Sequence, residues 1–89
     1  MNAFKISFLY KEKTYLASVH RVGGNPVQYL VFVEKPNDLE ISDPFVISAN
    51  LKNDRIEYGL PDKDFNLGHK IALAVKEYCY DNGIPLLEN

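Results

Sequence analysis

The sequence has a single cysteine, Cys79, and no long apolar run. A disulfide within the chain is therefore impossible, and a lone thiol suits a reducing compartment. No apolar stretch approaches the roughly 18 residues of a membrane-spanning helix, and Met1 to Phe8 lacks the apolar core of a secretory signal. We therefore expect a cytoplasmic protein without a membrane segment.

The spacings that mark catalytic and metal sites are also missing. Two histidines and one cysteine, far apart in the chain, do not form a tetrahedral metal set. His69 and Cys79 would lie about 15 Å apart along one helix, too far for a base and its nucleophile. Gly23 and Gly24 join two predicted strands, which is the wrong context for a phosphate-binding loop. We assign no catalytic residue, no cofactor and no metal, and favour a binding protein over an enzyme.

The composition is that of an ordinary folded domain. Hydrophobic residues make up 46% of the chain and charged residues 25%, and 89 residues are too few for two domains with separate cores. We expect one domain over residues 1–89. The net charge of −2 disfavours nucleic acid and anionic membranes as partners, although residues 1–33 are basic and residues 34–62 acidic.

Alternation of apolar and polar residues predicts a hairpin at the start of the chain. Residues 3–10 and 14–22 both alternate with the period of a half-buried strand. A two-residue loop at Lys11 and Glu12 would pair the two segments with their apolar side chains on one face, and a four-residue loop would preserve that parity. This hairpin forms the beginning of an antiparallel sheet.

Further strands follow a strong turn sequence. Residues 23–26 read Gly-Gly-Asn-Pro, which favours a second turn because glycine and asparagine tolerate positive φ. Residues 27–34 are apolar on both faces, as in a central strand, so their register stays open. Residues 45–51 and 55–60 predict another hairpin. The sheet should therefore have four to five strands.

One helix is predicted over residues 65–82. Asp62 or Asp64 can cap its beginning, and Gly83 is placed for a left-handed cap at its end. The apolar half of this helix should lie on the sheet; it comprises Phe65, Leu67, Ile71, Ala72, Val75, Tyr78 and Cys79. The expected fold is α+β, an antiparallel sheet followed by one C-terminal helix packed on one sheet face.

A single helix leaves the other face of the sheet uncovered. Leu9, Leu16 and apolar residues of the third strand would be exposed there, so either residues 84–87 or a second copy of the chain should cover them. Our leading hypothesis is a non-enzymatic interaction domain that forms a homodimer. The flank of the helix is a further candidate surface for a protein partner; it carries His69, Leu73, Lys76 and Tyr80.

Two alternatives from other functional classes stay open. The first hairpin interleaves tyrosines with basic residues, the arrangement that single-stranded nucleic acid favours. The cations of this candidate surface are Lys5, Lys11, Lys13 and Arg21. The second alternative is a small pocket between helix and sheet that binds a metabolite.

Overall fold

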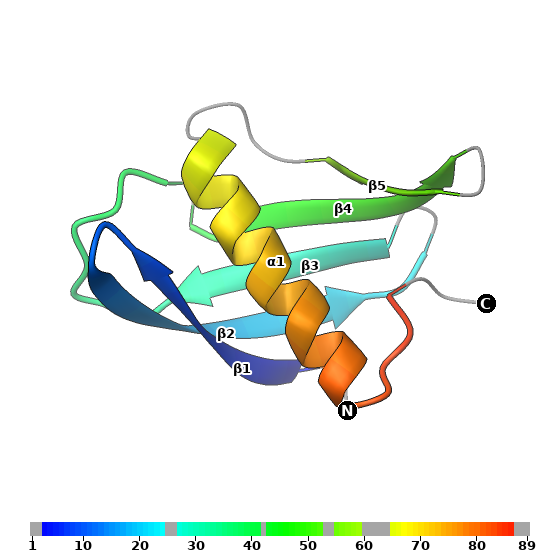
Figure 1. Ribbon diagram of the computed structural model, residues 1–89, viewed down its shortest axis with the longest axis horizontal. Coiled ribbons are helices and arrows are strands. Elements are labelled where there is room, and N and C mark those ends of the chain that lie inside the picture. Colours follow the sequence, from blue (N-terminus) through cyan, green and yellow to red (C-terminus); the bar gives the residue numbers. More distant parts are fainter. Residues whose placement is uncertain (1–2, 25–26, 42, 53–54, 60–64, 87–89) are drawn as a thin grey trace.

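The computed structural model describes residues 3–24, 27–41, 43–52, 55–59 and 65–86. Its elements are β1 (Ala3–Tyr10), β2 (Lys13–Val22), β3 (Val27–Val33), β4 (Phe45–Lys52), β5 (Arg55–Gly59) and α1 (Phe65–Asp81). The strands form one antiparallel sheet in the order β1-β2-β3-β4-β5, with α1 lying across it (Figure 1). The predicted α+β class, with a C-terminal helix on an antiparallel sheet, is confirmed.

The first hairpin has a two-residue loop, the shorter of the two lengths that the alternation allowed. Lys11 and Glu12 have φ values of 48° and 65°, the left-handed conformation that a tight turn needs to match the twist of its strands. The resulting register pairs Phe8 with Tyr15 and continues to Phe4 with Val19, as the alternation predicted. The rings of Phe8 and Tyr15 are stacked with their centroids 5.5 Å apart.

The register of β3, which the sequence left open, is set by its neighbours. Val31 pairs with Val19 of β2 on one side and with Phe45 of β4 on the other. The odd-numbered residues of β3 are consequently buried beneath α1, while Leu30 and Phe32 point to the opposite face. We call that opposite face the outer face of the sheet.

Helix α1 crosses the sheet diagonally, with its N-terminal end over β4 and its C-terminal end near β1 (Figure 1). The Tyr78 ring stacks on Phe4 of β1, with centroids 4.3 Å apart and planes 2° from parallel. The helix residues that the core buries are Leu67, Ile71, Ala72, Val75 and Cys79. The predicted caps Asp62 and Asp64 lie outside the described residues.

The helix ends in a Schellman motif, after which the chain turns back. Gly83 has the left-handed φ of 65°, and the Ile84 amide donates to the Cys79 carbonyl at 2.8 Å. Ile84 and Leu86 then pack against the core beside α1. Residues 84–86 therefore lie on the helix side of the sheet and do not cover the outer face. Leu87, the last residue of the predicted cover, lies outside the described residues.

Candidate interaction surfaces

The outer face of the sheet carries most of the exposed large apolar side chains of the described residues. Six large apolar side chains are exposed among the described residues, and four of them point outward from β1, β2 and β3. These four are Leu9, Leu16, Val22 and Phe32, with exposed fractions of 58%, 51%, 46% and 38%. Grouped apolar exposure of this kind is typical of interaction surfaces, whereas single exposed residues are common anywhere.

The strand register arranges most of these side chains in one line. Leu9 faces Thr14 across the β1–β2 ladder, so Leu16 is its diagonal neighbour on the same face. The Glu34 amide donates to the Leu16 carbonyl at 2.8 Å, so these two residues face each other across β2 and β3. Phe32, two residues before Glu34 on the same face, is therefore the next diagonal neighbour of Leu16. Leu30 and Val46, a pair across β3 and β4, extend the line. We call this line the diagonal stripe; it consists of Leu9, Leu16, Phe32, Leu30 and Val46.

Polar residues border the diagonal stripe on both sides. On the side toward the start of β1 lie Lys5, which pairs with Ser18, and His20, whose ring meets Phe32 edge-on at 5.3 Å. On the other side lie Thr14 and Glu34. Glu34 extends the alternation of β3 by one residue, so its exposed side chain follows Phe32 onto the outer face.

The predicted helix-flank surface is exposed along its whole length. His69, Leu73, Lys76 and Tyr80 are all solvent-exposed on α1. Leu73, Lys76 and Tyr80 also line a groove of about 510 Å³, whose other walls are Ile84 and Leu86 of the tail together with Glu77 and Asp81. His69 is not among the lining residues. The structure thus brings three of the four predicted residues into one concave site.

The four cations of the predicted nucleic-acid surface are spread over different sides of the hairpin. Lys5 lies on the outer face, whereas the Arg21 Nε donates to the Tyr29 hydroxyl at 3.4 Å on the helix side. The Lys11 ammonium lies 5.3 Å from the centroid of the Tyr10 ring at the turn. The Lys13 ammonium forms an ion pair with the Asp38 carboxylate. The hairpin therefore does not gather these cations on one face.

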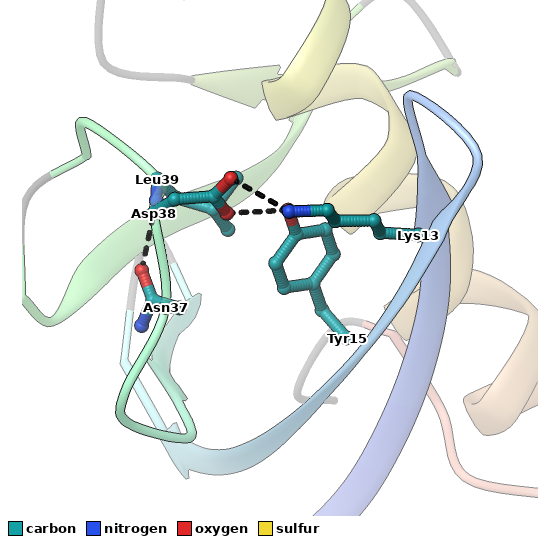
Figure 2. Close-up of polar contacts among 5 residues, drawn as sticks. All are labelled: Lys13, Tyr15, Asn37, Asp38 and Leu39. Carbon is teal, nitrogen blue, oxygen red and sulfur yellow. Dashed lines mark hydrogen bonds and ion pairs between the residues drawn. The ribbon is translucent and has the colours of Figure 1, made fainter.

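A polar cluster anchors the long loop after β3 to the first hairpin. The Asp38 carboxylate accepts from the Tyr15 hydroxyl at 2.7 Å and from the Lys13 ammonium at 3.1 Å (Figure 2). The Tyr15 hydrogen bond, with the Lys13 contact next, lowers the pKa of Asp38, and the same hydrogen bond raises the pKa of Tyr15. Asn37 shapes the loop by accepting from the Leu39 amide at 3.0 Å (Figure 2). Sequence reasoning missed this cluster, because its partners are more than twenty residues apart.

The cysteine is buried, as the sequence favoured. Cys79 faces the sheet from α1, and burial raises the pKa of its thiol, although a hydrogen bond with Tyr29 acts in the opposite direction. A thiol that stays protonated at neutral pH is a poor nucleophile. No three His, Cys, Asp or Glu side chains of the described residues gather as metal ligands would. Within the same residues, no helix has the length and apolarity to span a membrane.

Comparisons with protein-family models, with curated proteins and with solved structures found no match for this chain. The described residues offer two apolar surfaces as candidate interaction sites, the diagonal stripe and the groove beside α1.

Proposed function

We propose that this protein is a small, non-enzymatic interaction domain that self-associates through the outer face of its sheet. The observation that carries the proposal is the diagonal stripe. It crosses four strands, its side chains are not covered by residues 84–86, and polar side chains border it on both sides. An apolar centre with a polar rim is the usual anatomy of a protein interface.

A second copy of the chain suits the size of this face. The molecule measures 36 × 27 × 19 Å, and the sheet lies across the two longer dimensions, as the view down the shortest axis shows (Figure 1). A stable dimer buries about 800 Å² per partner. That area is roughly an eighth of the total accessible surface of 6199 Å², the share expected of one broad face of a molecule with these dimensions. A two-fold dimer of identical faces also needs no partner other than a second copy of the chain.

Sedimentation equilibrium over a range of protein concentrations tests the proposal. Leu16 and Leu73 provide a matched pair, because their exposed fractions are 51% and 50% and they lie on opposite sides of the molecule. We expect Leu16→Gln to dissociate the dimer and Leu73→Gln to leave it intact. A full-length chain that stays monomeric at high micromolar concentration would overturn the proposal. Dissociation by Leu73→Gln alone would move the interface to the helix flank.

Cytoplasmic residence is part of the same proposal. The free thiol of Cys79 supports it, because a lone unpaired cysteine is typical of a reducing compartment.

The alternative proposal is single-stranded nucleic-acid binding by the first hairpin. The Lys11 ammonium beside the Tyr10 ring supports it, since cations next to aromatic rings are common in such sites. Titration of labelled single strands should then show an affinity that falls with salt and with Lys11→Glu. The absence of binding at low salt would eliminate this alternative.

A further inference from the structure

The outer face carries a pair of opposite charges on either side of its apolar centre. Lys5 lies on one border of the diagonal stripe, one strand away from Ser18, which is itself the partner of Phe32. Glu34 lies on the other border, directly beside Leu16. The two charges therefore lie on opposite sides of the stripe at the same position along its length, beside Leu16 and Phe32.

Symmetry restricts how two such faces can meet. When identical faces pack against each other in a closed dimer, the two-fold axis lies in the plane between them. Only two orientations of that axis place stripe on stripe: along the stripe or across it. Any other orientation would set apolar side chains of one copy against polar border residues of the other.

The charges distinguish the two orientations. An axis across the stripe superimposes each border on itself, so the border with Lys5 and His20 would meet its own copy, and Glu34 would meet Glu34. Like charges placed opposite each other at an interface are repulsive. An axis along the stripe exchanges the borders, so that Lys5 of each copy lies over Glu34 of the other.

Resting on the proposed self-association, we infer that the protein forms a two-fold dimer whose axis runs along the diagonal stripe, with two symmetry-related ion pairs between Lys5 and Glu34. The stripe supplies the buried apolar centre of this dimer. The two ion pairs lie at its rim and select the orientation of the second copy.

Charge reversal tests the arrangement through the dimer dissociation constant, measured by sedimentation equilibrium at low salt. Lys5→Glu and Glu34→Lys should each raise Kd by about tenfold, because each change replaces two attractions with two repulsions. The double variant should restore the wild-type Kd. Added salt should shrink the difference between the single variants and wild type.

Lys70→Glu is the matched control. Lys70 is exposed on α1, on the opposite side of the molecule, so its reversal changes the net charge as much as Lys5→Glu does without touching the outer face. We expect its Kd to equal that of wild type. An equimolar mixture of the two single variants should associate as tightly as wild type, because one variant is acidic at both positions and the other basic at both, so that opposite charges face each other in the mixed dimer.

The outcomes separate this inference from the proposed function. Under an axis across the stripe, neither single reversal would weaken the dimer, because a like-charge contact would merely change sign. A dimer that Leu16→Gln disrupts but Lys5→Glu leaves unchanged would therefore overturn the axis and keep the self-association. A dimer that neither Leu16→Gln nor Lys5→Glu weakens would overturn both the proposed axis and the proposed interface. Edge-to-edge pairing of β1 would give such a dimer.

Discussion

The Tyr29 hydroxyl donates a 2.6 Å hydrogen bond to the Leu86 carbonyl, joining the central strand to the tail 57 residues later. Tyr29 is buried, and burial raises the pKa of its hydroxyl, which therefore stays protonated and able to donate at physiological pH. This bond holds the tail on the helix side of the sheet.

Tyr29→Phe should remove the bond and lower the free energy of unfolding by about 1 kcal/mol. The loss arises because the Leu86 carbonyl and the Arg21 Nε each lose a partner. Denaturant titration measures it. Tyr80→Phe is the control, because the Tyr80 side chain is 86% exposed and should tolerate loss of its hydroxyl without effect. A Tyr29→Phe variant as stable as wild type would show that the bond contributes nothing to stability.

A chain that ends at Gly83 should be less stable, with its self-association unchanged. It loses the packing of Ile84 and Leu86 against the core, but neither residue covers the outer face. Thermal unfolding checks the first expectation. Sedimentation equilibrium, below the unfolding transition, checks the second. New association that appears only on truncation would mean that the tail shields an interface.

Ile71→Ala should cost about 2 to 5 kcal/mol of unfolding free energy. Ile71 is fully buried between α1 and the sheet, so the shorter side chain leaves a cavity. Leu73→Ala, two residues further along the same helix, removes a half-exposed side chain and should change stability little. Equal losses for the two variants in denaturant titrations would contradict the packing of α1.

Replacing Lys11-Glu12 by Asn-Gly should stabilise the protein by on the order of 1 kcal/mol. Both residues have positive φ, which costs free energy for most side chains with a Cβ atom. Glycine lacks this atom, and asparagine tolerates the conformation because its short side chain can hydrogen-bond locally. Ser-Ser at the same positions removes the same two charges and should bring no such gain. A shift of the denaturant midpoint that is equal for both double variants would assign the effect to charge instead.

Acid should weaken the anchoring of the loop by Asp38. The Tyr15 hydrogen bond and Lys13 hold the pKa of Asp38 below its ordinary value, so the folded state binds this proton less tightly than the unfolded state. The stabilisation is therefore present above the ordinary carboxyl pKa of about 4 and is lost as pH falls through the lower, folded-state value. Asp38→Asn should flatten the stability profile in that range. Unfolding titrations at several pH values measure it, and parallel profiles would contradict the linkage.

The sequence by itself determined the elements whose partners are close along the chain. The register of β1 and β2 follows from alternation and a two-residue loop, because a tight turn leaves little freedom in the pairing. The buried side of α1 and its end at Gly83 follow from the helical period and from the φ that glycine accepts.

The tertiary structure decided what depends on contacts between distant residues. The outward direction of Phe32 needed the neighbours of β3, because that strand is apolar on both faces. The position of Leu86 depends on its hydrogen bond from the Tyr29 hydroxyl. The pairing of Asp38 with Tyr15 depends on the path of the loop after β3. The diagonal stripe, finally, exists only when four strands are in register, since alternation assigns a residue to a face but not to a neighbour across the sheet.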